Sequence, residues 1–258
     1  MPQHRERNIA MTSREAAIYQ LKKLKGQPFK KKISYILTYF WVPITAVVAA
    51  VVFLVSMCIH WASLKPSALT ICCINSAAEQ ENIDGYLQGF ARAQGINTEQ
   101  YQLTARIDIT FFGKDMEIDY QNAQALFALM VTGGLDVMAA DHDTIVRYSY
   151  QQAFIDMEEL LTQEQMDILA PHLLYMDLGY LDEMDTVSDE TRQYPDPTKP
   201  EDMEQPVPIA ITLQPGWEFA KTAYPYTYGE DAVALIAGAD NSDNAAAFLQ
   251  YVLDQEGN

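Results

Sequence analysis

The sequence predicts an α/β protein with a mostly parallel sheet flanked by helices, preceded by one transmembrane helix. An uncharged apolar stretch at residues 36–59 is long enough to cross a bilayer. From residue 69 onward, short apolar runs alternate with amphipathic segments, and this order favours a parallel sheet because parallel neighbours require crossover connections. Hydrophobic residues make up 49% of the chain and charged residues 20%, which is typical of a globular protein.

Charge is distributed unevenly along the 258 residues. Residues 1–32 carry nine basic and two acidic side chains, whereas residues 65–258 carry eight basic and 33 acidic ones. Residues 33–64, which lie between them, carry no formal charge. The net charge of −18 argues against nucleic acid as a partner, because phosphate binding requires a basic surface.

The apolar stretch at 36–59 has the features of a membrane anchor, with membrane lipid as its partner. Trp41 and Trp61 lie near its ends, where aromatic rings favour the headgroup layer. Six lysines between residues 22 and 32 precede it, so the positive-inside rule predicts a single pass with a cytoplasmic N-terminus. A cleaved signal peptide is the alternative, but its apolar region is ordinarily about 7–15 residues long.

Three parts of the chain follow from this topology. Residues 1–32 are a basic cytoplasmic tail with a short amphipathic helix, and residues 33–64 are the anchor and its flanks. Residues 65–258 form an acidic extracytoplasmic domain at the cell membrane. Within that domain, residues 182–206 hold nine acidic residues and four prolines, which is typical of a loop or lid.

The first elements of the acidic domain alternate between strand and helix. Residues 69–74 are almost continuously apolar, as in a strand buried on both faces. A helix capped by Ser76, with Glu79 three residues on, is expected to end at Gly95. Residues 103–111 alternate strictly between apolar and polar, which indicates a half-exposed strand at an edge.

A second helix begins at Asp119 or Tyr120 and closes at Gly133-Gly134. Its predicted core stripe includes Leu126 and Phe127. Residues 135–140 are then predicted to form the third strand.

The remaining elements are marked by caps and short apolar runs. Residues 141–144 cap one helical stretch, and Thr162 with Gln165 begins another. Residues 207–213 and 232–237 are strand candidates. The final amphipathic helix begins at residues 240–243.

Three segments in this order carry a resemblance to a known family. They are residues 134–141 (GLDVMAAD), residues 154–160 (FIDMEEL) and residues 241–249 (NSDNAAAFL). Over residues 69–258 the chain resembles the extracellular solute-binding proteins of ABC importers, which have the type-2 periplasmic-binding fold. The resemblance implies ligand capture beside a transporter.

The chain departs from that family in one respect. The family inserts a second lobe after the third strand, but here only residues 142–206 are available. We therefore expect a single periplasmic-binding-like lobe. A half-site buries too little of a small ligand for high-affinity capture.

Candidate ligand-binding residues lie where the predicted strands end. Asn75 and Ser76 follow the first strand, and Asp141 and His142 follow the third. Ligands collect at the carboxyl ends of strands in open α/β sheets, where helix N-termini add a positive dipole. Helix capping by Ser76, Asp141 and Asp143 is the favoured alternative, because these residue types frequently cap helices.

Aromatic side chains cluster after Pro215-Gly216. Trp217 is a candidate for ligand binding, and Tyr224, Tyr226 and Tyr228 are candidates for an interface, because such rings stack on sugars or anchor protein contacts. Packing of the loop itself explains them equally well.

The sequence favours a non-enzymatic protein without cofactor or metal. It has no P-loop, nucleophile elbow, dinucleotide fingerprint or metalloprotease motif. Its four histidines lack zinc spacing. Adjacent Cys72 and Cys73 are expected to be buried thiols, because neighbours on a strand point to opposite faces.

The predicted function is that of a bacterial-type, non-catalytic accessory or interaction domain outside the cell membrane, working with a transporter or another surface protein. Two alternatives stay open. One is a tethered module that binds a small solute, such as a sugar or peptide, and completes its cleft with a second copy or a partner. The other is a carboxylate-based hydrolase of cell-wall or sugar polymers that depends on Asp141.

Overall fold

The computed structural model describes residues 28, 33–34, 38, 41–111, 116–181, 194–226 and 231–255. The chain divides into two compact units, Met1–Leu64 and Lys65–Asn258. The predicted basic-tail helix and residues 182–193 of the acidic loop lie outside the described residues.

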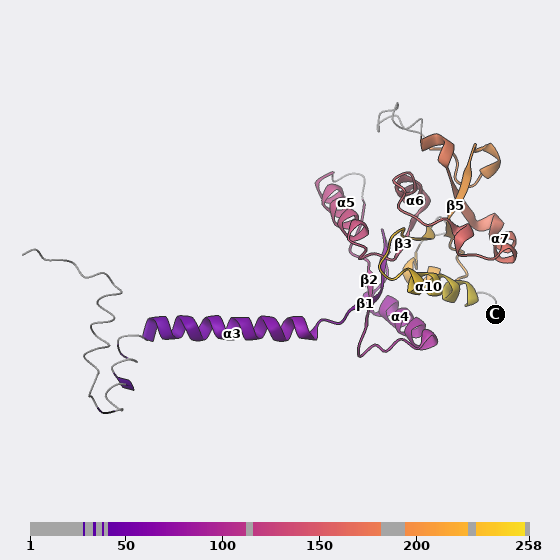
Figure 1. Cartoon of the computed structure of the whole chain (residues 1–258). Helices are drawn as coiled ribbons and strands as arrows, with labels where there is room; N and C mark the ends of the chain where they lie inside the picture. The colour runs from indigo at the N-terminus through magenta and orange to yellow at the C-terminus, as the bar shows by residue number, and fades with distance from the viewer. Residues whose placement is uncertain are drawn as a thin grey trace, which may run out of the picture. The chain divides into compact units, whose positions relative to one another are not determined.

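The first unit contains helix α3 (Trp41–Ser63), drawn in indigo in Figure 1. Its segment Trp41–Trp61 spans 21 residues with a mean hydropathy of 2.6, so it is long and apolar enough to cross a membrane. None of this segment is buried. Pro43 lies in the first turn, where a helix tolerates its missing N–H group. The helix covers most of the predicted span, with both tryptophans inside it.

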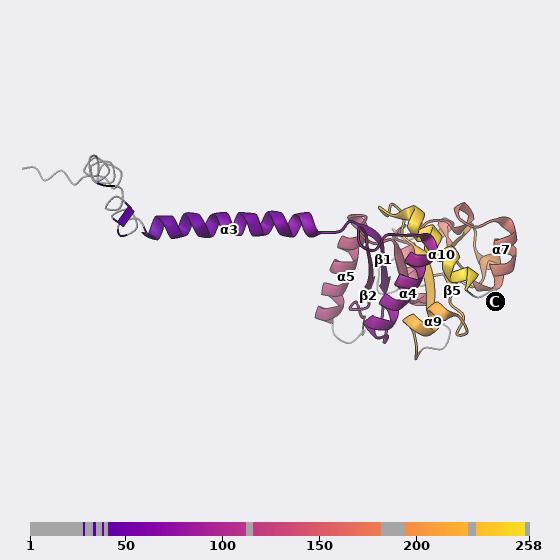
Figure 2. The same cartoon turned by 90° about the horizontal axis from the view of Figure 1, so that it is seen from below.

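The second unit is a mixed six-stranded sheet between two layers of helices (Figures 1 and 2). The strand order is β2-β1-β3-β6-β5-β4. The strands are β1 (Ser67–Cys73), β2 (Gln102–Arg106), β3 (Val137–Asp141), β4 (Leu173–Asp177), β5 (Pro206–Thr212) and β6 (Asp231–Leu235).

The sheet is not wholly parallel. Strand β1 pairs in parallel with β2 and β3, whereas β6 pairs antiparallel with β3 and β5, and β4 antiparallel with β5. Strands β1, β2, β3 and β5 therefore run one way, and β4 and β6 run the other. Antiparallel neighbours need no crossover, so β5 follows β4, and β6 follows β5, without a helix crossing the sheet.

Helices cover both faces of the sheet. They are α4 (Gln80–Gln94), α5 (Met116–Val131), α6 (His142–Ser149), α7 (Gln163–Leu169), α9 (Glu218–Ala223) and α10 (Ser242–Asp254). Short 3₁₀ turns are η1 (Met157–Glu159), η2 (Ala170–His172), η3 (Leu178–Tyr180) and η5 (Pro200–Asp202). In Figure 1, α5 and α6 lie above the strands, and α4 and α10 lie below.

Two hydrophobic cores lie on opposite faces of the sheet. Alternate residues of β1 point to different cores: Ile71 and Cys73 to one, Cys72 to the other. Under α4, α9 and α10 the first core contains a cluster of aromatic rings, with Phe248 at 5.3 Å from Phe90 and 5.4 Å from Phe219 between ring centroids. Such edge-to-face rings add to the stabilisation from burial alone.

Helix α4 ends where the sequence predicts but does not begin as predicted. Gly95 terminates it in the left-handed conformation at φ 68°, which glycine adopts without steric cost. The N-cap is Glu79, without a side-chain cap bond, so the capping box from Ser76 was wrong. The hydroxyl of Ser76 instead accepts from the N–H of Ala78 at 3.1 Å.

Two predictions around the second crossover were also wrong. The expected strand at 103–111 ends at Arg106, although β2 does lie at the sheet edge. Phe127, placed in the core stripe of α5, is 57% exposed, whereas its neighbour Leu126 is fully buried. Helix α5 is apolar around much of its circumference, so periodicity alone does not select the buried face.

The later elements follow the sequence with two omissions. The predicted box of Thr162 and Gln165 caps α7, and the strand candidates become β5 and β6. Strand β4 and helix α9 were not predicted, and α9 is only six residues long. From the acidic loop, described residues 194–205 contain only the short turn η5.

Candidate functional site

Polar side chains meet at the carboxyl edge of the sheet, as the strand order predicts. Asn75 follows β1 in the left-handed conformation at φ 56°. Its Oδ1 accepts from the N–H of Phe111 at 2.7 Å, and its Nδ2 donates to Asp141 at 3.4 Å. The ends of β1 and β3 are therefore joined by the two predicted site residues Asn75 and Asp141.

Asp141 mainly serves as a helix cap. Its carboxylate accepts from the N–H of Thr144 at 2.9 Å and from the hydroxyl of Thr144 at 3.0 Å. His142 is the first residue of α6, and its Nε2 lies 3.1 Å from the hydroxyl oxygen of Thr212 at the end of β5. The capping alternative thus accounts for Asp141, while His142 extends the polar cluster across the sheet.

Ser76 lies beside this cluster but is directed toward α9. Its hydroxyl donates to the carbonyl oxygen of Ala223, the last residue of α9. Trp217 is at the opposite end of α9, where it occupies the N-cap position and packs against the first core. The structure therefore brings Asn75, Asp141 and His142 together and leaves Trp217 apart from them.

The three predicted interface tyrosines have different surroundings. Tyr224 is only 5% exposed, and its hydroxyl donates toward the carbonyl oxygens of Ala139 (2.6 Å) and Ile74 (3.1 Å). Burial raises the pKa of this phenol well above its ordinary value. Tyr226 is 75% exposed, and Tyr228 lies outside the described residues. Tyr224 thus stabilises the fold, and an interface role stays a prediction for Tyr226.

Two buried carboxylates elsewhere in the domain also have structural partners. Asp136 is fully buried, and burial raises the pKa of its carboxyl despite hydrogen bonds from Thr70 and Asn241. For Asp177, burial raises the pKa, but backbone N–H groups of Gly179, Glu204 and Gln205 outweigh it and hold the pKa below its usual value.

The sequence did not predict a groove that lies between α4, α9 and α10. Its volume is about 460 Å³, within the range of small-molecule sites. Helices α4, α9 and the end of α10 line it. The lining residues are Asn82, Gly85, Tyr86, Gly89, Glu218, Lys221, Thr222, Tyr251 and Gln255.

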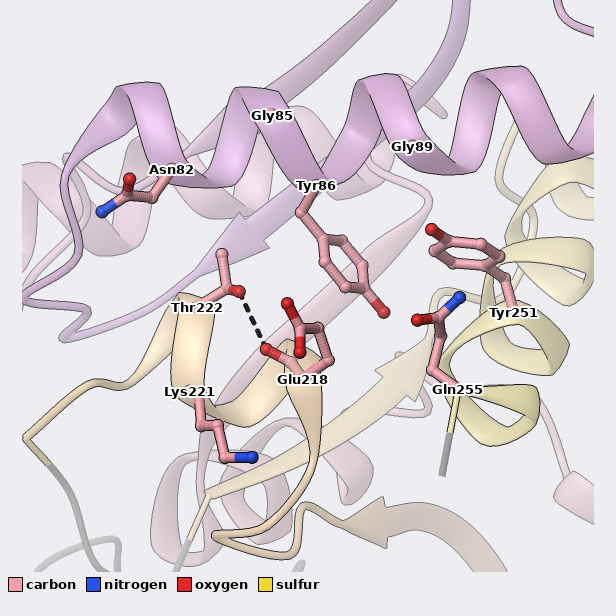
Figure 3. A pocket seen from close by; sticks show the side chains of 9 residues that line it. All are labelled: Asn82, Gly85, Tyr86, Gly89, Glu218, Lys221, Thr222, Tyr251 and Gln255. Carbon is pink, nitrogen blue, oxygen red and sulfur yellow. Dashed lines mark hydrogen bonds between the residues drawn. The ribbon is translucent and has the colours of Figure 1, made fainter. Parts of the chain in front are cut away.

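Polar groups surround this groove (Figure 3). The ring centroids of Tyr86 and Tyr251 are 5.5 Å apart. The figure shows the Tyr86 hydroxyl and the Gln255 amide directed into the same space, with Glu218 beside them, while Lys221 extends away from the two tyrosines. The sequence signal for the groove is the pair of glycines four residues apart on α4, which helical periodicity places on one face.

Burial makes the two adjacent cysteines poor nucleophiles. Burial raises the pKa of the Cys72 thiol to about 12, so this group is protonated at neutral pH and is a poor nucleophile. Burial likewise raises the pKa of Cys73. Among the described residues, no group of three or more His, Cys, Asp or Glu side chains is placed to hold a metal ion.

Known proteins provide no further identification. No family model, no curated protein and no solved structure matches this chain.

Proposed function

We propose that this chain is a membrane-tethered, non-catalytic interaction domain, with its acidic globular part outside the cell membrane beside a transporter or another surface protein. The observation that carries the proposal is helix α3. Its apolar side chains are exposed, as shown by Phe53 at 67% and Val52 at 62%. Exposure of so much apolar surface to water is unfavourable, so lipid is the natural surrounding.

The charge pattern supports the proposed orientation. The tail at 1–32 carries a formal charge of +7, and residues 65–258 carry −25. A basic segment next to an apolar span is retained on the cytoplasmic side.

Helix α5 supports the interaction role. Tyr120, Phe127 and Val131 are 65%, 57% and 68% exposed, and their spacing places them on one side of the helix. Exposed apolar patches of this kind mark protein contacts more often than isolated apolar residues do. Because the domain around them is strongly acidic, we expect a protein partner with an apolar centre and a basic rim.

The polar residues at the sheet edge are more consistent with binding than with hydrolysis. Asp141 is committed to the start of α6 through both the N–H and the hydroxyl of Thr144. General acid–base catalysis requires a carboxyl group within reach of a substrate proton, with a pKa suited to the transfer. This cap favours the interaction domain over the carboxylate-based hydrolase.

A single lobe of the solute-binding type remains part of the proposal. Residues 134–141 contain β3, and residues 241–249 begin α10. The two segments are in contact through Asp136 and Asn241. Their contact supports the resemblance, since both segments would then belong to one lobe.

Tag accessibility tests the orientation. Intact cells expressing the chain with one tag before Met1 and another after Asn258 are treated with external protease. Digestion of the C-terminal tag alone supports the proposal, and the lysed-cell control should lose both. Protection of the C-terminal tag beside digestion of the N-terminal tag would refute the orientation.

Native electrophoresis in mild detergent tests the partner surface. The wild-type chain should migrate in a complex with a second membrane or surface protein, and Phe127→Glu with Val131→Glu should release it. Ile168→Glu is the matched control, because Ile168 is also 68% exposed but lies on α7. Assembly of this chain with itself alone, or equal release by the control, would contradict the proposed partner.

A further inference from the structure

The groove between α4, α9 and α10 carries an inference that goes beyond the proposed interaction role. It belongs to the folded domain and is independent of both the anchor α3 and the exposed face of α5. None of the sequence-predicted site residues lines it. It is therefore a second surface of the domain.

The wall of the groove contains a glycine that internal packing does not explain. Gly85 lies in the interior of α4, where glycine is unfavourable relative to alanine because it loses more backbone freedom on folding. A Cβ atom at Gly85 would meet no heavy atom within 4 Å. Gly85 therefore leaves open space beside α4 where a larger side chain would fit.

Gly89, one turn later, shows the contrast. A Cβ atom there would approach the hydroxyl oxygen of Tyr251 to 2.9 Å, so close packing with α10 accounts for this glycine. Gly85 differs because its open side is the groove itself. A backbone left bare beside a groove allows close approach of a ligand.

The lining groups define the chemistry of that ligand. Asn82 and Gln255 each offer an amide that both donates and accepts, and Glu218 adds an acceptor. The ring of Tyr251 is partly exposed and offers an apolar surface for C–H groups. This combination matches a compact molecule that carries many hydroxyl groups and a C–H face.

Charge narrows the ligand class further. The charge of −25 on residues 65–258 disfavours anionic ligands. In Figure 3 the ammonium group of Lys221 is directed away from the two tyrosines and from Gln255. The two lining amides, Asn82 and Gln255, are uncharged groups that hydrogen-bond hydroxyl groups by both donating and accepting.

We propose that this groove binds a neutral saccharide, with Gly85 providing the space for the sugar ring and Gln255 and Asn82 hydrogen-bonding its hydroxyl groups. Tyr86 is buried, and its ring centroid lies 5.5 Å from that of the partly exposed Tyr251. The site is open, so the expected affinity is modest.

Calorimetric titration of the full chain in lipid nanodiscs tests this site. The probes are glucose, N-acetylglucosamine, maltose and cellobiose, with choline and citrate as the cationic and anionic comparisons. Saturable binding of at least one saccharide supports the proposal. Binding of choline or citrate in preference to every saccharide, or no saccharide binding, overturns it.

Substitutions locate the binding. Gly85→Leu fills the groove and should weaken saccharide binding at least about tenfold, equivalent to about 1.4 kcal/mol of binding free energy. Gly216→Leu is the matched control, because Gly216 also faces open space but does not line the groove. Unchanged affinity in Gly85→Leu, or equal loss in the control, would contradict the assignment.

Gln255→Ala provides a second variant in case Gly85→Leu perturbs the fold. Gln255 is exposed and follows the last residue of α10, so its truncation should preserve the thermal unfolding profile. The substitution should weaken binding of the same saccharide, because it removes one amide that hydrogen-bonds the sugar hydroxyl groups. Saccharide binding is measured by calorimetry and complex formation through α5 by native electrophoresis. Failure of one proposal can therefore be told apart from failure of the other.

Discussion

The buried carboxylate of Asp136 accepts hydrogen bonds from both the backbone and the side chain of Asn241. Its Oδ1 lies 3.1 Å from the backbone nitrogen, and the side-chain amide lies 3.2 Å from Oδ2. Oδ2 also accepts from the N–H of Thr70 at 2.6 Å. One carboxylate thus ties β1, the start of β3 and the start of α10 together, and these hydrogen bonds offset part of the cost of burying it.

Asn241→Ala should destabilise the domain by about 1–3 kcal/mol, because it removes donors from a fully buried carboxylate. Asn244→Ala is the control in the same helix, where the amide donates to the neutral carbonyl of Ala68 at 2.8 Å. The control should cost about 1 kcal/mol. Chemical unfolding at neutral pH measures both, and a smaller loss in Asn241→Ala than in the control would contradict the structural role of Asp136.

Asp177 should contribute to acid sensitivity. Its pKa in the folded domain lies below the ordinary value of 3.8, since three backbone N–H groups outweigh the effect of burial. Its contribution to stability is therefore present above pH 3.8 and is lost as the pH falls through the folded pKa. Asp177→Asn should lower stability at pH 7 by about 1–3 kcal/mol and flatten this part of the acid profile.

The control for that experiment is Asp167→Asn on the exposed surface of α7. It removes the same charge and should leave both the stability at pH 7 and the shape of the acid profile nearly unchanged. Unfolding free energies measured from pH 7 down to the acid limit compare the three proteins. Parallel profiles for wild type and Asp177→Asn would refute the assigned role.

Val48→Arg combined with Val51→Arg should release the chain from membranes. Both valines lie in the middle of α3 and are more than half exposed. Each arginine near the centre of a span costs about 2.5–3.5 kcal/mol of insertion free energy. Extraction of cell membranes at alkaline pH should leave the wild type and the Val48→Leu/Val51→Leu control in the pellet. Retention of the double-arginine variant would argue against insertion of this helix.

Leu126 and Phe127 test the orientation of α5. Leu126→Ala should destabilise the domain by about 2–5 kcal/mol, because Leu126 is fully buried. Phe127→Ala should cost less than about 1 kcal/mol, because 57% of Phe127 is exposed. Thermal or chemical unfolding of the two variants decides the point. Similar losses would place Phe127 in the core, as the periodicity of the sequence predicts.

The sequence predicted best those features that depend only on neighbouring residues. The αL glycine at Gly95, the Thr162 capping box and the Asp141 cap are local features, and each is present in the structure. The failures concern contacts between distant parts of the chain. Which way a strand runs depends on its neighbour, so β6 beside β3 could not be assigned from its apolar run.

The two candidate sites differ in the same way. The edge cluster was predictable because Asn75 and Asp141 directly follow strands, and the carboxyl ends of parallel neighbours meet. The groove joins α4 to residues more than 120 positions later, around Glu218 and Tyr251. Only the placement of α9 and α10 against α4 brings those side chains together.

Gly85 and Gly89 allow the groove to be tested by stability alone. Gly85→Ala should stabilise the domain by up to about 1 kcal/mol, because alanine is the better helix former and its methyl group meets no atom within 4 Å. Gly89→Ala has the same gain in propensity, but its methyl group would approach the Tyr251 hydroxyl to 2.9 Å, so the Tyr251 side chain must shift and the gain should be lost. Thermal unfolding of the two variants measures the difference. If Gly85→Ala were as destabilising as Gly89→Ala, packing would explain both glycines, and the open wall of the groove would no longer need a ligand to account for it.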